Sequence, residues 1–231
     1  LAEIALKHDI VIISDEVYRE YVYDGEKQIS MLEFPELKEN CIIIDSESKR
    51  YSMCGVRIGF LVIRSQSLHN AAMLFAQARL SPVLIGQILA TAAHNDDTEY
   101  INSVREEYTK RRNLLVELLN QIPGVKCPKP KGAFYCVAEL PVEDADVFAQ
   151  WLLEEFSDNG ETVMVAPASG FYSQPELGKK QVRIAYVLKS EDLKRSVELL
   201  KLALASSQVA APEFWRLETK VQTKVVENRS G

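Results

Sequence analysis

Residues 41–49 read Cys-Ile-Ile-Ile-Asp-Ser-Glu-Ser-Lys, and this stretch carries the strongest sign of the fold. A short apolar run rich in isoleucine is typical of a strand that is buried on both faces in a parallel sheet. The run stops at Asp45, and Ser46, Ser48 and Lys49 follow at once. Open α/β sheets bind ligands at the carboxyl ends of their strands. We therefore expect these three polar side chains to lie at a ligand site.

Two more apolar runs lie before and after this one in the chain. Residues 9–14 (DIVIIS) end just before Asp15, with Tyr18 three residues further on, and residues 57–63 (RIGFLVI) begin with Arg57. The first run again predicts a strand buried on both faces. Together the runs predict part of a mostly parallel sheet, so the expected fold class is α/β. Asp15 and Tyr18 then follow one strand, and Arg57 starts another.

The rest of the chain predicts helices followed by a smaller α+β unit. A long amphipathic helix runs from about Thr98 to Ile122, where Pro123 stops it. Beyond it we expect strands over residues 132–140, 163–165 and 182–187, and helices over residues 145–156 and from residue 190. We accordingly divide the chain into part of a large domain (1–93), a small C-terminal α+β domain that includes the long helix (94–205) and a weakly patterned tail (206–231).

Composition disfavours several classes of function. The chain has 231 residues, a net charge of -6 and a pI near 5.3, whereas proteins that bind nucleic acid carry an excess of Lys and Arg. No apolar run is long enough to span a membrane and no charged-then-apolar leader opens the chain, so we expect a cytoplasmic protein. The 4 cysteines and 3 histidines are scattered, which argues against a metal site.

The polar residues at the strand ends fit one kind of chemistry when they are taken together. Lysine forms Schiff bases with carbonyl cofactors, and a cofactor phosphate needs hydroxyl donors and a bidentate arginine. Pyridoxal phosphate also needs an anion beside its pyridinium nitrogen. Each residue alone has a simpler explanation, since Asp15 could cap a loop, Lys49 could be solvated and Arg57 could pair with a carboxylate. Only the combination favours a cofactor site.

The same residues resemble the motifs of a known enzyme family. Residues 46–49 (SESK) and 55–59 (GVRIG) are similar to the S-x-S-K…G-x-R-x-G signature of class I aminotransferases, pyridoxal-phosphate-dependent enzymes of fold type I. Residues 15–18 (DEVY) resemble the family's D-E-x-Y. Further family landmarks follow in order at residues 132–135 (GAFY), 166–167 (AP), 170–171 (GF) and 182–185 (VRIA). The resemblance is of the aspartate/tyrosine aminotransferase kind and covers roughly residues 1–205.

The resemblance implies a role for each residue that contacts the cofactor ring. Lys49 would bear pyridoxal phosphate as a Schiff base and, once displaced, would move a proton between the substrate and the cofactor. Asp15 would pair with the pyridine nitrogen, and its negative charge would raise the pKa of that nitrogen. Tyr18 would hydrogen-bond the phenolic oxygen.

The resemblance likewise implies which residues bind the two anionic groups. Ser46, Ser48 and Arg57 would hold the cofactor phosphate. Arg183 would bind the substrate α-carboxylate bidentately, a geometry that lysine cannot copy. From the residues alone, an arginine that alternates with valine and isoleucine in a strand could simply face solvent.

The activity implied is transfer of an amino group between an amino acid and a 2-oxo acid, by an enzyme that is usually a homodimer. The same lysine chemistry also serves β-lyases and decarboxylases, and a non-catalytic dimerisation or binding module could keep the fold. A plain flavodoxin-like domain fits the strands but gives the lysine loop no purpose.

The start of the chain adds one more expectation. The chain opens at Leu1 in what resembles the end of a helix, whereas the family places a phosphate-binding loop, a stacking aromatic and an asparagine upstream of D-E-x-Y. We therefore expect the front portion to be missing, the strand over residues 9–14 to have an unpaired apolar edge, and the isolated chain to be inactive.

Overall fold

The computed structural model describes residues 1–95 and 98–206, so the expected tail lies outside the described residues from 207 onward. The chain forms two units. The first holds residues 1–107, apart from 96–97, together with 131–133, and the second holds residues 108–130 and 134–206. The division after residue 93 that the sequence suggests stays a prediction.

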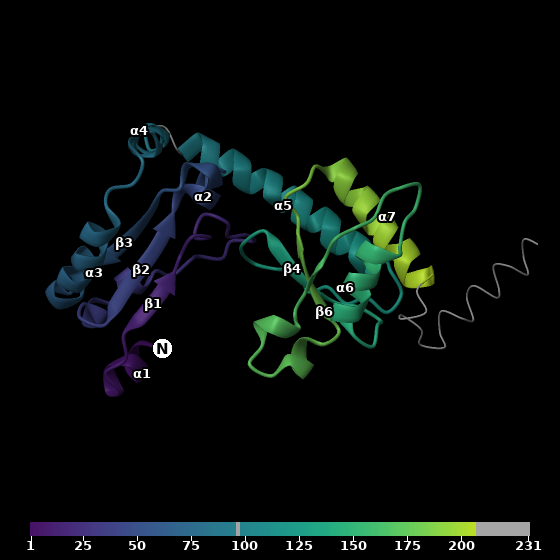
Figure 1. The fold of residues 1–231 in the computed structure, drawn as a ribbon, viewed down its shortest axis with the longest axis horizontal. Coiled ribbons are helices and arrows are strands. Elements are labelled where there is room, and N and C mark those ends of the chain that lie inside the picture. The colour runs from purple at the N-terminus through teal and green to yellow at the C-terminus, as the bar shows by residue number, and fades with distance from the viewer. Residues whose placement is uncertain (96–97, 207–231) are drawn as a thin grey trace, which may run out of the picture. The chain divides into compact units, whose positions relative to one another are not determined.

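The first unit contains a three-stranded sheet in the order β1-β2-β3 (Figure 1). β1 (Ile12–Asp15) pairs in parallel with β2 (Cys41–Ser46), and β3 (Gly59–Ile63) pairs antiparallel with β2. The sequence pattern locates all three strands but does not reveal the direction of β3. Because β3 runs the opposite way, its first residue lies beside the last residue of β2.

The burial of β1 corrects one expectation. The apolar run predicts a strand covered on both faces, but exposure alternates along β1 and Ile13 is 63% exposed. The covered face packs in a core cluster of buried residues, namely Ala5, Leu37, Cys41 and Ile43, with Ile12 partly buried against it. β1 is also an edge strand of this sheet, as expected for an unpaired apolar edge. Within the described chain, therefore, only one face of β1 has a covering layer.

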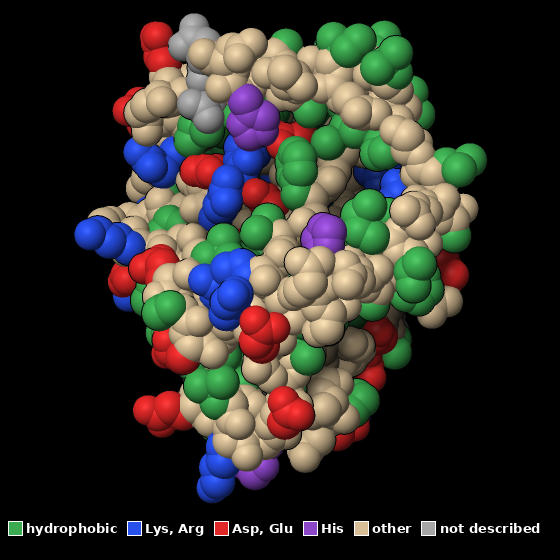
Figure 2. Space-filling view, turned by 90° about the vertical axis from the view of Figure 1, so that its left-hand side faces the viewer, with side chains coloured by type: hydrophobic (Ala, Val, Ile, Leu, Met, Phe, Trp, Pro, Cys, Tyr) green, Lys and Arg blue, Asp and Glu red, His purple; other side chains and the backbone are tan. Residues whose placement is uncertain are grey.

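The helices of the first unit expose much of their apolar surface. They are α1 (Ala2–Lys7), the single turn α2 (Glu47–Arg50), α3 (Gln66–Arg79) and α4 (Leu84–Ala93). Within the fully described α3 no residue is buried, and its Phe75 is 80% exposed. Figure 2 shows hydrophobic side chains at the surface on this side of the molecule.

The second unit combines three helices with an antiparallel sheet in the order β4-β6-β5. The helices are α5 (Thr98–Asn120), whose first turns belong to the first unit, α6 (Ala145–Glu154) and α7 (Ser190–Ser206); the strands are β4 (Tyr135–Glu139), β5 (Ala166–Pro167) and β6 (Gln181–Ala185). The expected strand over residues 163–165 is wrong, because pairing with β6 begins only at Ala166. The apolar stripes of the helices supply buried core residues such as Leu119, Phe148 and Leu200.

Short 3-10 helices connect these elements: η1 (Met31–Glu33), η2 (Pro35–Leu37), η3 (Cys54–Val56), η4 (Ser169–Phe171) and η5 (Pro175–Gly178). None of the helices in the described part of the chain is long and apolar enough to cross a membrane. Across residues 1–95 and 98–206, no group of three or more His, Cys, Asp or Glu side chains is arranged to hold a metal ion.

Candidate active site

Polar residues from all three strands of the first sheet meet at one of its ends. Asp15 is the last residue of β1 and lies opposite Ile44 of β2. Ser46 ends β2 opposite Gly59, the first residue of β3, and Arg57 precedes β3 by two residues. The topology therefore brings Asp15, Ser46 and Arg57 to the end of the sheet where the carboxyl ends of parallel strands bind ligands.

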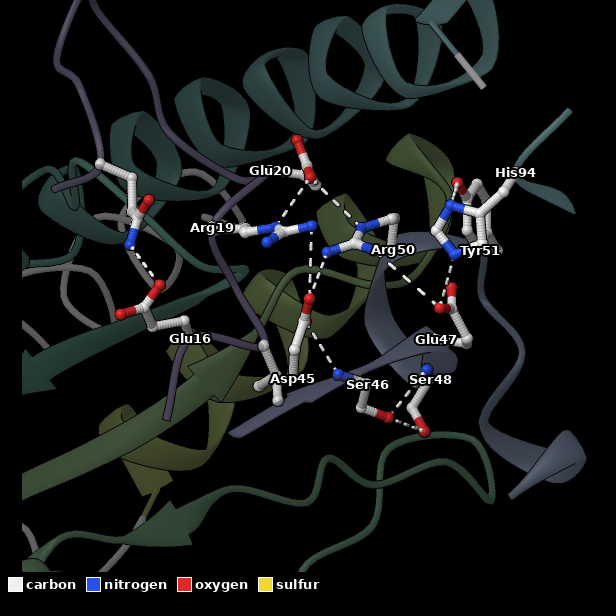
Figure 3. Close-up of polar contacts among 12 residues, drawn as sticks. Glu16, Arg19, Glu20, Asp45, Ser46, Glu47, Ser48, Arg50, Tyr51 and His94 are labelled. Carbon is white, nitrogen blue, oxygen red and sulfur yellow. Dashed lines mark hydrogen bonds and ion pairs between the residues drawn. The ribbon is translucent and has the colours of Figure 1, made fainter. Parts of the chain in front are cut away.

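Ser46 and Ser48 form a pair of hydroxyl groups ahead of Lys49. Ser46 is the N-cap of α2, and its Oγ accepts a hydrogen bond of 3.1 Å from the backbone N–H of Ser48. The two hydroxyl oxygens lie 2.9 Å apart, and Ser46 Oγ is 3.1 Å from the carbonyl oxygen of Ile58 (Figure 3). Both serines are half-buried. Such a pair can offer O–H donors to an anionic oxygen.

Lys49 lies in α2, and its backbone is held from the loop after β1. The carbonyl oxygen of Lys49 accepts a 2.6 Å hydrogen bond from the hydroxyl of Tyr21, a residue that is 2% exposed. Lys49 itself is half-buried. Its position in the chain is thus fixed by a buried tyrosine, while its side chain can still be reached from outside.

Asp15 ends β1, and Tyr18 lies on the loop that follows it. The Oδ1 atom of Asp15 accepts a 3.3 Å hydrogen bond from the N–H of Val17, which is the local capping contact that a simple loop aspartate makes. Asp15 is nevertheless exposed, so its carboxylate can take a further partner. The ring of Tyr18 packs edge-on against Tyr21, with the ring centroids 6.4 Å apart.

Arg57 stands in a constrained turn before β3. Its φ of 62° is left-handed, which costs a non-glycine residue about 1 kcal/mol, and such strain clusters at functional sites. Its Nη1 atom donates a 2.8 Å hydrogen bond to the carbonyl oxygen of Cys54, and the residue is exposed. A methyl group added at Gly59 would lie 3.0 Å from the carbonyl oxygen of Asp45, so the turn closes tightly on β2.

Arg183 belongs to the second unit, on β6. Its guanidinium carbon lies 4.6 Å from the ring centroid of Tyr135 and 4.7 Å from that of Phe171, so two aromatic rings contact it. The side chain also lines a cavity of about 520 Å³ whose other lining residues are mostly apolar. Arg183 is half-buried against these rings, and its role in binding substrate stays a prediction. The structure gathers the other six predicted site residues in the first unit.

Sequence reasoning missed a charged cluster on the buried side of the lysine segment, which we define as residues 45–50. The charged cluster consists of Arg19, Glu20, Asp45, Glu47, Arg50 and His94 (Figure 3). A signal was present in the sequence, since Asp45 and Glu47 continue the period-two pattern of the buried residues Cys41 and Ile43. Charged residues at buried positions must be paired, so the pattern already demanded partners.

The pKa of Arg50 reflects this pairing. Burial alone would lower the pKa of the Arg50 guanidinium, but its hydrogen bond to Asp45 and the nearby carboxylates of Glu20 and Glu47 raise that pKa above its ordinary value.

The donor set at the end of the first sheet fits pyridoxal phosphate. Two hydroxyls and a guanidinium suit a phosphate, a half-buried amine suits an aldehyde, and an exposed carboxylate suits a pyridinium nitrogen. The tight approach at Gly59, where a larger residue would meet the backbone of β2, keeps the loops after β2 and before β3 together.

Comparison with known proteins agrees with this chemistry. The family model described as aminotransferase class I and II matches residues 1–200. The chain is 35% identical over 209 residues to the aspartate aminotransferase of Bacillus subtilis (strain 168), which covers 87% of this chain and 51% of that relative. It is 30% identical over 213 residues to aromatic-amino-acid aminotransferase 2 of Thermococcus litoralis, with 90% and 52% covered. The chain spans about half the length of these curated relatives.

A solved structure agrees as well. That of an aromatic aminotransferase from Pyrococcus horikoshii OT3 superimposes with a TM-score of 0.77 at 29% identity, over 88% of this chain and 53% of that chain. The family match extends over most of the sequence and includes every residue of the candidate site. The chain therefore belongs to the class I and II aminotransferases.

Proposed function

We propose that this chain forms part of a pyridoxal-phosphate-dependent aminotransferase and that Lys49 bears the cofactor. The observation that supports this most directly is the arrangement at one sheet end, where a half-buried lysine follows two paired serine hydroxyls. An exposed aspartate ends the neighbouring strand at the same edge. A lysine amine, hydroxyl donors and a carboxylate are the groups that this cofactor requires.

Each residue of the first unit has a part in this proposal. Ser46, Ser48 and Arg57 hold the phosphate, since Ser46 pairs with Gly59 and Arg57 lies two residues before Gly59 in the chain. Asp15 would accept a hydrogen bond from the protonated pyridine nitrogen, and Tyr18 would hydrogen-bond the phenolic oxygen. When bound, pyridoxal phosphate acts as an electron sink for the substrate. The lysine amine, once released, holds and returns the proton of the substrate α-carbon.

The substrates we propose are an amino acid and a 2-oxo acid, both bound through their carboxylate by Arg183. The guanidinium contacts the rings of Tyr135 and Phe171, which restrict its orientation, and guanidinium groups bind carboxylates bidentately. Loss of either ring would let the guanidinium turn. The net charge of -6 argues against nucleic acid as a partner, and a membrane is not part of the proposal.

The proposed assembly and cellular setting rest on exposed apolar surface and on the cysteines. Large exposed apolar side chains on α3 and α4 suit a homodimer, since such surface is usually covered. The four cysteines are free, which suits the reducing cytoplasm. We also keep the division into a large-domain part (1–93) and a small domain (94–205) as a proposal. Because the chain spans about half of its relatives, we expect no transamination by the isolated chain.

Reductive trapping tests the proposal. The purified chain is mixed with pyridoxal phosphate and reduced with borohydride, and the modified peptides are mapped by mass spectrometry. Preferential labelling at Lys49, with loss of that label in Lys49→Ala, is expected. Labelling spread evenly over the surface lysines, and unchanged in the variant, would contradict the assignment of Lys49.

A further inference from the structure

The lysine segment has two chemically different sides. Ser46, Ser48 and Lys49 are half-buried, whereas Asp45, Glu47 and Arg50 are 6%, 0% and 5% exposed. The cofactor-binding groups thus lie on one side of a short stretch of backbone, and the charged groups lie on the other. Because both sets share this backbone, a shift of the buried side chains moves the lysine as well.

Among the buried charged residues of the lysine segment, Glu47 depends most strongly on its few partners. Its side chain is fully buried, and its Oε1 atom is 2.8 Å from His94 Nε2 and 4.0 Å from Arg50 Nη1. Among the described residues its Oε2 atom has no hydrogen-bond partner. A buried carboxylate with so few partners depends strongly on each one that remains. The contact with His94 is its shortest.

His94 reaches Glu47 from a different element. It is the C-cap of α4, its side chain is 42% exposed, and its Nδ1 atom lies 3.2 Å from the hydroxyl of Tyr51. The rings of His94 and Tyr51 also meet edge-on, with centroids 5.3 Å apart. Tyr51 therefore orients the imidazole through Nδ1, while Nε2 bonds Glu47.

The other end of α4 touches the same region of the chain. A methyl group added at Gly86 would lie 2.8 Å from the carbonyl oxygen of Val56 and 3.2 Å from the side chain of Ile58. Val56 and Ile58 flank Arg57, the proposed phosphate ligand. Thus α4 contacts the residues around Arg57 near its start and Glu47 at its end.

We propose that Glu47 and His94 are positioning residues, through which α4 braces the lysine segment so that Lys49 stays on the cofactor side. The proposal rests on the proposed role of Lys49 and deepens it. Neither residue touches the cofactor in this scheme, and both act through the backbone of α2. Glu47 stands at the position that the S-x-S-K signature leaves open, so the family motif does not itself supply the brace.

Two labelling reactions of Lys49, whose yields should change in opposite directions when the brace is lost, test the proposal on the whole chain. Acetic anhydride reports how accessible the Lys49 amine is without any cofactor, and pyridoxal phosphate with borohydride reports capture. Lys126, whose side chain is 75% exposed, is the internal reference in each sample. In His94→Phe the ring remains but the bond to Glu47 is lost. We expect Lys49 acetylation relative to Lys126 to rise about tenfold, since a hydrogen bond to a charged group is removed, and trapping to fall by a similar factor.

A double variant separates positioning from general damage. In Glu47→Leu/His94→Phe the buried carboxylate of residue 47 is removed together with its partner. Acetylation and trapping of Lys49, each relative to Lys126, should then return to within about threefold of the values for the unmodified chain. Tyr23→Phe is the matched control, because it removes a buried 2.7 Å hydrogen bond to Ala133 in the same unit without touching the lysine segment. Its ratios should not change.

The outcomes are distinct. An acetylation ratio that is unchanged in His94→Phe, or a double variant as altered as the single one, would overturn the brace. A third outcome separates the two proposals. If Lys49 acetylation rises in His94→Phe and returns in the double variant, but trapping shows no preference for Lys49 in the unmodified chain, the brace is supported and the cofactor assignment is refuted. Far-UV circular dichroism of each variant confirms that it is folded.

Discussion

Arg50→Met is the substitution with the largest stability effect that we expect at the charged cluster. Arg50 Nη2 donates a 2.6 Å hydrogen bond to Asp45, and its Nε is 3.2 Å from Glu20. Methionine keeps the unbranched apolar stem but removes the charged guanidinium and leaves these carboxylates behind. Breaking a buried ion pair in this way costs about 3–5 kcal/mol. Glu20 is 30% exposed and can turn to water, and Asp45 keeps Arg19 at 3.3 Å, so we expect the low end, about 3 kcal/mol.

Urea unfolding followed by far-UV circular dichroism measures this loss, and Arg195→Met is the matched control. Arg195 makes three ion pairs of 2.6–2.9 Å, but its side chain is 29% exposed. Water screens pairs at such a position and side-chain entropy opposes them, so Arg195→Met should cost less than Arg50→Met despite its shorter contacts. A loss below about 1 kcal/mol for Arg50→Met, or a larger loss for Arg195→Met, would refute the idea that burial decides the effect.

Three further outcomes follow from single positions. Gly86→Ala should lower the free energy of unfolding by about 1 kcal/mol, because the clash with the Val56 carbonyl outweighs alanine's better helix propensity; an increase measured in urea would contradict this. Ser46→Ala should lose about 1 kcal/mol of stability with the N-cap of α2 and should also weaken trapping of pyridoxal phosphate, so full trapping would argue against a phosphate role. The hydrogen bond with Cys127 and burial raise the pKa of the Cys136 thiol above its ordinary 9.0, so the folded chain keeps a proton that the unfolded chain releases. Stability should therefore fall as pH rises above about 9, and this fall should be smaller in Cys136→Ala when unfolding is measured at pH 8 and 10.

The strands and helices were largely predictable because each has a simple pattern. Apolar runs located β1 and β2, and the periodic stripe with Pro123 located α5. The direction of β3 was not predictable, since an apolar strand has the same pattern whichever way it runs. The exposure of Ile13 was not predictable either, because an apolar residue does not reveal whether a covering layer is present.

The candidate site likewise contains residues that the sequence predicted and contacts that it did not. Ser46, Ser48 and Lys49 could be named from their place after an apolar strand and from the resemblance of residues 46–49 to the family's S-x-S-K motif. The partner of Glu47 could not, since His94 lies 47 positions away and only the course of α4 brings the two together. The left-handed backbone at Arg57 was equally hidden, because arginine rarely adopts it.

The two contacts of α4 have a thermodynamic consequence. Its outer side chains Leu84, Ile85 and Ile88 are 58–70% exposed, while its start touches Val56 and its C-cap bonds Glu47. Under the proposed brace, a molecule that binds this outer surface more tightly when pyridoxal phosphate is bound raises the affinity for the cofactor by the same factor, because coupling free energies are reciprocal. The helix would then link occupancy of a surface and occupancy of the proposed lysine site in one equilibrium.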